Sequence, residues 1–233
     1  MNDQLSKTSN GVSKVLIVAA HADDEVLGMG GTIAKHTKNG DEVRLIVLAD
    51  GESSRDEPGD IEKREQEAKK AAEILGIENI IFKRFPDQQL DTLPLLKINK
   101  AIEEVLAEFK PEIIYTHNPT DLNKDHQLAC PATLTACRPQ PGFSVKKILA
   151  FEVLSSTEWQ IKDKASMFAP TEYNDISEFI DQKIKALRIY QDELKNYPHP
   201  RSIEGVKILA QYRGIEVGYK YAEAFQVIRI LND

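Results

Sequence analysis

Residues 14–20 read KVLIVAA, and residues 21–25, which follow directly, read HADDE. The first stretch is a continuous apolar run of largely β-branched character, typical of a strand buried on both faces of a parallel sheet. The second holds an imidazole and three carboxyl groups. In open α/β sheets, ligands bind beyond the carboxyl ends of the strands. The sequence therefore predicts a buried first strand with a functional site at its end.

Apolar runs and helical patterns alternate through the first half of the chain. The expected strands and helices follow in the order Lys14–Ala20, Val26–Lys38, Val43–Ala49, Ile61–Leu75, Ile80–Phe85, Leu96–Phe109 and Ile113–Thr116. Such an alternation with short connections predicts a mostly parallel sheet covered by helices on both faces. The predicted fold class is therefore α/β, a Rossmann-like three-layer sandwich.

The second half is less regular. We expect a strand at Ile148–Leu154, helices at Ile176–Leu194 and Ile203–Gly218, and a closing strand at Ala224–Leu231. A length of 233 residues, of which 41% are hydrophobic, suits one domain with a sizeable core. We expect that domain to cover residues 13–233 and to follow a flexible leader over residues 1–12.

Composition and charge exclude several kinds of function. The net charge of −7 argues against a sequence-independent nucleic-acid binder, which needs a basic face. The polar N-terminus lacks the apolar region of a signal peptide, and no apolar run is long enough to span a bilayer. Two cysteines, Cys130 and Cys137, are too few for a disulfide framework. These features favour a cytoplasmic protein.

A second polar segment, residues 117–126 with the sequence HNPTDLNKDH, follows the fourth expected strand. Because the carboxyl ends of parallel strands lie at one edge of a sheet, this segment can converge on HADDE. An imidazole and a carboxylate three residues apart could hold a divalent ion, and zinc accepts mixed nitrogen and oxygen ligands. Alternatively, the acids could complement a helix N-terminus, and His126 could simply begin a helix. Two converging clusters favour the metal site.

With both segments in view, the chain resembles the PIG-L/LmbE family of zinc-dependent N-deacetylases. The family motif Ala-His-Pro-Asp-Asp-Glu matches residues 20–25, with Ala22 in place of proline, and its second metal motif matches Asp125-His126. Further matches are residues 27–32 (LGMGGT), 50–52 (DGE), 64–65 (RE), 213–214 (RG) and 222–225 (AEAF). The resemblance spans most of the chain and implies an LmbE-like fold.

The resemblance also implies roles for individual residues. The implied zinc ligands are His21, Asp24 and His126, and the implied general base is Asp23. Arg64 and Asp87 match positions that contact substrate in relatives. His199 matches a recurring late segment to which we assign no role.

One departure from the family pattern concerns Asn123, which stands where many members have a histidine that helps to polarise the amide carbonyl. An asparagine can donate a hydrogen bond to an oxyanion but cannot deliver a proton in the same way. The departing amine could instead receive its proton from Asp23 or from His117. We expect Asp125 to orient a neighbouring donor.

These expectations combine into a reaction. Zinc lowers the pKa of bound water, Asp23 takes a proton from it, and an N-acetyl group is hydrolysed from an amino sugar. The expected partner is a small N-acetylated sugar or sugar conjugate, and the protein could assemble as a homo-oligomer.

Two other classes of function compete with this prediction. The glycines at Gly28–Gly31 could belong to a nucleotide-binding module, but Ile33 occupies the place of the third glycine in the dinucleotide fingerprint. These glycines are better explained by close packing between helix and sheet. A magnesium-dependent phosphohydrolase would use oxygen ligands, so His21 and His126 weigh against it. Trp159 could either stack on a sugar or pack in the core.

Overall fold

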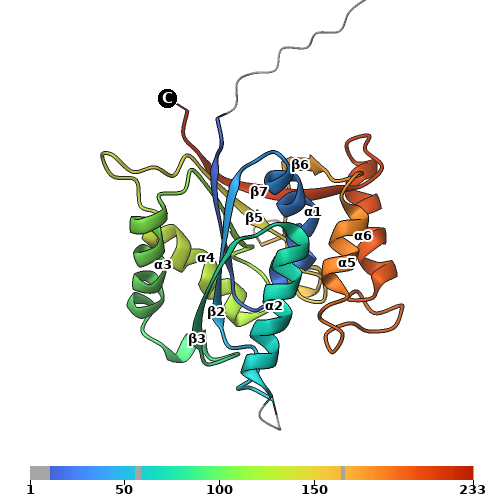
Figure 1. Cartoon of the computed structure of the whole chain (residues 1–233), viewed down its shortest axis with the longest axis horizontal. Helices are drawn as coiled ribbons and strands as arrows, with labels where there is room; N and C mark the ends of the chain where they lie inside the picture. Colours follow the sequence, from blue (N-terminus) through green and yellow to red (C-terminus); the bar gives the residue numbers. More distant parts are fainter. Residues whose placement is uncertain (1–10, 56–58, 164–165, 233) are drawn as a thin grey trace, which may run out of the picture.

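The computed structural model describes residues 11–55, 59–163 and 166–232 (Figure 1). Residues 1–10 of the expected leader lie outside this set. Within the described residues, seven strands form one sheet in the order β3-β2-β1-β4-β5-β7-β6. The strands are β1 (Lys14–Ala19), β2 (Glu42–Ala49), β3 (Asn79–Phe85), β4 (Ile113–His117), β5 (Lys147–Phe151), β6 (Glu172–Asp175) and β7 (Ala222–Ile230).

The first five strands are parallel, and β7 runs antiparallel to both β5 and β6. The chain winds outward from β1 to β3 and then returns to place β4 on the other side of β1. The strand order therefore reverses between β1 and β4, and the crevice at such a reversal is where α/β sheets bind ligands. This arrangement confirms the predicted mostly parallel α/β fold.

Helices cover both faces of the sheet. They are α1 (Asp24–Lys38), α2 (Ile61–Leu75), α3 (Leu95–Phe109), α4 (Lys124–Ala136), α5 (Ile180–Leu187) and α6 (Ile203–Ile215), with short 3-10 turns η1 (Leu90–Thr92) and η2 (Thr157–Trp159). Figure 1 shows α3 and α4 on one face and α1, α2, α5 and α6 on the other. Each helical layer buries its own apolar cluster against the sheet. The fold is the three-layer sandwich that the sequence predicts.

The glycines of α1 serve close packing, as expected. A Cβ atom at Gly28 would lie 2.5 Å from the ring of Phe151 on β5, and one at Gly31 would lie 2.7 Å from Ile176. Both helical positions therefore need the smallest residue.

The predicted bounds are wrong in the second half. The helix expected at Ile176–Leu194 covers only Ile180–Leu187, and β6 was not expected at all. After Leu187 the chain turns, and Tyr190 becomes fully buried with its hydroxyl donating to Glu25 Oε1 (2.9 Å). The helix therefore ends before Tyr190, and the turns after it carry this side chain to Glu25. The four residues of β6 are only partly buried and lack an apolar run.

Candidate metal centre and active site

Three buried side chains converge at the crevice between β1 and β4. His21 follows β1, Asp24 begins α1, and His126 lies in the first turn of α4. His21 Nδ1 lies 3.3 Å from Asp24 Oδ2, and His126 Nε2 lies 3.2 Å from the same oxygen. The two ring nitrogens are 3.3 Å apart. These three residues could hold one metal ion.

Two carboxylates fix the orientation of the His21 ring. Its Nε2 lies 3.0 Å from Asp87 Oδ1 and 3.1 Å from Asp125 Oδ2. Because an ionised carboxylate only accepts hydrogen bonds, a neutral His21 ring carries its proton on Nε2 and turns the lone pair of Nδ1 toward Asp24 and His126. Metal-binding histidines commonly have this arrangement, with the second nitrogen bound to a carboxylate. Asp125 and Asp87 thus both orient the ring of His21, one of the candidate metal ligands.

Asp121 orients the ring of His126 in the same way, although the sequence analysis assigns Asp121 no role. Its Oδ1 lies 3.2 Å from His126 Nδ1. The hydroxyls of Ser156 and Thr157 donate to its two oxygens, and the backbone N–H of Asn123 donates to Oδ1 (2.9 Å). Its place in the quoted segment, five residues before His126, was the available signal.

Charges around the three converging atoms favour a cation there. Burial lowers the pKa of His21, but hydrogen bonds to Asp125, Asp24 and Asp87 outweigh it and raise that pKa well above its ordinary value. Burial also lowers the pKa of His126, but Asp24 and Asp121 outweigh this effect, and the net shift is upward. Burial would raise the pKa of Asp24, yet the imidazoles hold it well below its usual range.

Asp23 points away from this centre. Its φ of 124° lies in a region that disfavours side chains, and it turns the carboxylate toward two arginines. Arg201 Nη1 donates to Asp23 Oδ2 (3.0 Å), and Arg64 Nη2 lies 3.7 Å from Oδ1. Burial raises the pKa of Asp23, although both arginines oppose that shift.

Arg201 and Glu193 join the site without having been predicted. Glu193 Oε1 lies 3.1 Å from Arg64 Nη1, and its Oε2 lies 3.3 Å from Arg201 Nη1. Arg64, Glu193, Arg201 and Asp23 thus form one partly buried ion-pair network. The sequence analysis singles out the segment around His199 without a role, and the residue of that segment that reaches Asp23 is Arg201.

The two remaining predicted residues have well-defined surroundings. His117 is fully buried, its Nε2 accepts from the Ala20 N–H (2.8 Å), and its ring stacks on His126 at 4.0 Å. Burial lowers the pKa of His117 to about 3, so its ring is neutral. Asn123 is the N-cap of α4, where its Oδ1 accepts from the N–H of Asp125 (2.8 Å). Because Oδ1 is used in this cap, the amide nitrogen of Asn123 is the side-chain group that can donate a hydrogen bond to a ligand.

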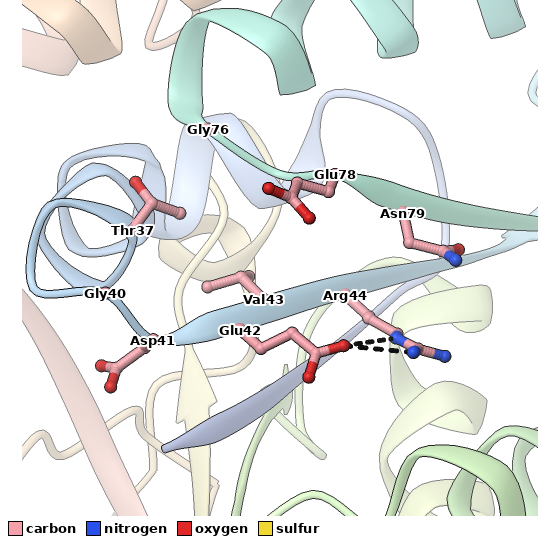
Figure 2. Close-up of a pocket in the computed structure, with 9 residues that line it drawn as sticks. All are labelled: Thr37, Gly40, Asp41, Glu42, Val43, Arg44, Gly76, Glu78 and Asn79. Atoms are coloured by element: carbon pink, nitrogen blue, oxygen red, sulfur yellow. Dashed lines mark hydrogen bonds and ion pairs between the residues drawn. The ribbon is translucent and has the colours of Figure 1, made fainter. Parts of the chain in front are cut away.

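A hollow of about 450 Å³ lies at the opposite edge of the sheet, at the amino ends of β2 and β3 (Figure 2). Figure 2 shows Glu42 paired with Arg44 inside it, and glycines and a threonine on its wall. In the described residues, two overlapping groups could hold a metal, and neither includes a residue of this hollow: His21, Asp24 and His126, and His21, Asp87 and Asp125. The candidate metal ligands therefore lie in the β1–β4 crevice and not in this hollow. None of the helices in the described part of the chain is long and apolar enough to cross a membrane.

The fold and the crevice define a class: an α/β protein with two histidines and a carboxylate poised to bind a metal at the reversal of strand order. The chain belongs to the PIG-L family, because the family pattern described as "GlcNAc-PI de-N-acetylase" matches residues 16–137, more than half of the chain.

Comparisons with individual proteins agree with this membership. The chain is 26% identical to the diacetylchitobiose deacetylase of Thermococcus kodakarensis, over 97% of this chain and 86% of the relative. It superimposes on the N,N'-diacetylchitobiose deacetylase of Pyrococcus horikoshii with a TM-score of 0.76, at 22% identity, over 93% of this chain and 84% of that one. It also superimposes on GalB, the 4-carboxy-2-hydroxymuconate hydratase of a Pseudomonas, with a TM-score of 0.75, at 24% identity, over 95% and 99%. The fold is therefore shared by different chemistries.

Proposed function

We propose that this protein is a zinc-dependent N-deacetylase that hydrolyses the acetamide of an N-acetylated amino sugar. The relative in Thermococcus supports the deacetylase reaction, and the family description supports an N-acetylglucosamine-like substrate. The proposed ligands are His21, Asp24 and His126.

One observation carries the proposal: two imidazole nitrogens and a carboxylate oxygen face one another at 3.2–3.3 Å. Neutral imidazoles and an ionised carboxylate at these distances repel one another unless a proton or a metal ion lies among them, and a metal ion can contact all three atoms at once. Zinc–nitrogen bonds of roughly 2.0–2.1 Å in a tetrahedron put neighbouring ligand atoms about 3.3–3.4 Å apart. An octahedral magnesium site with similar bond lengths needs only about 2.9 Å, and it prefers oxygen ligands. The donor set and its spacing both favour zinc over the magnesium phosphohydrolase alternative.

When bound, zinc would act as a Lewis acid that makes water more acidic and an amide carbonyl more electrophilic. Asp23 would accept the proton of the attacking water as the water oxygen bonds to the carbonyl carbon. A carboxylate whose pKa is raised by burial is better suited to this task than an exposed one. Asp23 would then return the proton to the nitrogen as the carbon–nitrogen bond breaks, which releases acetate and a free amine.

The surrounding residues would support these steps. Arg201 and Arg64 would hold the Asp23 carboxylate in place, and Asp121, Asp125 and Asp87 would orient the two histidines. The amide nitrogen of Asn123 would donate to the developing oxyanion. The neutral ring of His117 would support His126 by stacking, because a group with a pKa of about 3 is a poor proton donor to an amine at neutral pH.

The proposal is tested by amine release from the zinc-loaded protein with N-acetylglucosamine, N,N'-diacetylchitobiose and N-acetylmuramic acid. Asp23→Asn should keep its zinc and lose at least about 100-fold in kcat/KM, since it removes the proton acceptor. Asp192→Asn is the matched control, because Asp192 forms an exposed ion pair with Lys63, and it should keep full activity. No amine release from any substrate would refute the proposed reaction, and an active Asp23→Asn variant would refute the role of Asp23.

A further inference from the structure

The backbone N–H of Asp23, the proposed base, is bound by a buried carboxylate that takes no part in the proposed reaction. Glu25 Oε2 accepts that N–H at 3.1 Å, and the Glu25 residue is only 1% exposed. Asp23 is the N-cap of α1, and an acid in the first turn of a helix can bind the backbone N–H of the N-cap residue. Glu25 therefore helps to fix the backbone of Asp23.

Tyr190 binds the other oxygen of Glu25. Tyr190 lies three residues after the end of α5, it is fully buried, and its hydroxyl donates to Glu25 Oε1 at 2.9 Å. A phenylalanine would fill the same apolar space, so packing alone does not explain the hydroxyl. Because Glu25 is almost completely buried, its carboxylate depends on protein donors rather than on solvent. The Tyr190 hydroxyl thus fixes the orientation in which Glu25 meets Asp23.

The ring of Tyr190 supports a second contact of Asp23. Arg64, on α2, lies over this ring with its Cζ atom 5.2 Å from the ring centroid, and its Nη2 lies 3.7 Å from Asp23 Oδ1. A guanidinium is attracted to the face of an aromatic ring. Tyr190 therefore reaches Asp23 by two routes. Its hydroxyl acts through Glu25 on the backbone, and its ring acts through Arg64 on the carboxylate.

Asp23 needs this support because its backbone is strained. A residue other than glycine keeps a φ of 124° only where its surroundings enforce that angle. The carbonyl of Asp23 is held by α1 itself, through the N–H groups of Val26 (3.0 Å) and Leu27 (2.9 Å). The N–H is the remaining backbone group, and Glu25 is its partner. Loss of the Tyr190 hydroxyl would free Glu25 to rotate, and Asp23 could then relax and move its carboxylate.

Asp24 is held by a separate set of contacts. Its Oδ2 accepts the backbone N–H of His21 at 2.8 Å and lies 3.2 Å from His126 Nε2. Neither of these contacts involves Tyr190 or Glu25. We therefore expect the proposed metal ligand to stay in place when the Tyr190 hydroxyl is removed. The position of the base and the retention of the metal can thus be separated by experiment.

We propose that Tyr190 is a positioning residue for the base. Its hydroxyl, acting through Glu25, holds the strained backbone of Asp23 in the orientation in which the carboxylate can accept a proton from water. The kinetic consequence rests on the proposed deacetylase function. The hold on the Asp23 backbone can be measured without turnover.

The kinetic test uses Tyr190→Phe, which removes the hydroxyl and keeps the ring. With N-acetylglucosamine and N,N'-diacetylchitobiose as substrates, kcat should fall about 10-fold because the base is misplaced, while KM stays within about twofold. The zinc content should not change. Tyr115→Phe is the matched control, since Tyr115 is also buried and its hydroxyl contacts His36 Nε2 (3.0 Å), which is no part of the metal centre. It should keep its kcat. An unchanged kcat in Tyr190→Phe, or an equal loss in Tyr115→Phe, would overturn the proposal.

The structural test is hydrogen exchange at the Asp23 N–H, followed by NMR of the ¹⁵N-labelled protein. In Tyr190→Phe this N–H should exchange at least about 10-fold faster relative to the amides of β1, whereas Tyr115→Phe should leave that ratio unchanged. Unchanged protection in Tyr190→Phe would overturn the proposal, whatever the kinetics. Faster exchange in a protein that releases no amine from any sugar would support the hold on Asp23 and refute the proposed reaction. Amine release together with unchanged protection would refute the role of Tyr190 and leave the reaction intact.

Discussion

Asp23 and Asp24 are adjacent acids with different surroundings, and the backbone at Asp23 separates them. A side chain at φ 124° and ψ −26° costs about 1–3 kcal/mol, and such strain persists where neighbouring contacts enforce it. Here the enforcing contacts are the ion pairs to Arg201 and Arg64 on one side and the histidine cluster on the other. The strained backbone thus turns the Asp24 carboxylate toward the proposed metal site and holds Asp23 apart from it, where the proposed function needs a base.

Asp121 allows a test of orientation without removal of a ligand. Asp121→Asn keeps the shape of the side chain but loses the charge that faces His126 Nδ1, so we expect zinc affinity to fall about 10- to 100-fold. Competition with a chelator of known affinity measures this. Asp175→Asn is the control, because Asp175 accepts from Ser177 at the end of β6 and contacts no histidine. Equal zinc affinity in both variants would contradict the role of Asp121.

At the scale of elements, α1 is interrupted at Met29, and a buried ion pair satisfies the groups that this break frees. Glu223 on β7 accepts from the N–H groups of Gly31 (2.9 Å) and Thr32 (2.6 Å). Lys183 on α5 donates to the Leu27 carbonyl (2.9 Å) and to Glu223 Oε1 (2.6 Å). Three elements are therefore joined by one buried charge pair beneath the helix that presents Asp24.

We therefore expect Lys183→Met to destabilise the fold strongly. It leaves Glu223 as an uncompensated buried charge, and breaking such a pair costs about 3–5 kcal/mol in the free energy of unfolding. Lys38→Met removes a lysine from the exposed pair with Glu178 and should change that free energy by no more than about 1 kcal/mol. Urea denaturation of the two variants measures the difference. A Lys183→Met protein as stable as the Lys38→Met protein would show that the buried pair does not stabilise the fold.

At the scale of the whole molecule, the sequence predicts what is local and misses what depends on the path of the chain. The parallel strands and the HADDE and Asp125-His126 segments carry their own patterns, so the fold and the clustering of His21, Asp24 and His126 followed from them. Arg201 meets Asp23 across 178 residues, and no spacing in the sequence encodes that contact. The sequence predicts that the helix containing α5 continues to Leu194, because the apolar periodicity continues past the turn at Arg188.

Metal removal tests whether the proposed site stabilises the whole fold, because a metal ion held between β1, α1 and α4 would link these three elements. A ligand at 1,000 times its dissociation constant adds about 4 kcal/mol, which for a domain of this size raises Tm by roughly 10 °C. We therefore expect a chelator to lower Tm by about that amount and zinc, but not magnesium, to restore it. His126→Ala should bind no zinc and show no such shift. His36→Ala should keep the full shift, because His36 contacts Asp41 and Tyr115 and no residue of the metal centre. A normal zinc content in His126→Ala would remove His126 from the ligand set, and identical melting of the unaltered protein with and without chelator would mean that the three converging side chains bind no metal.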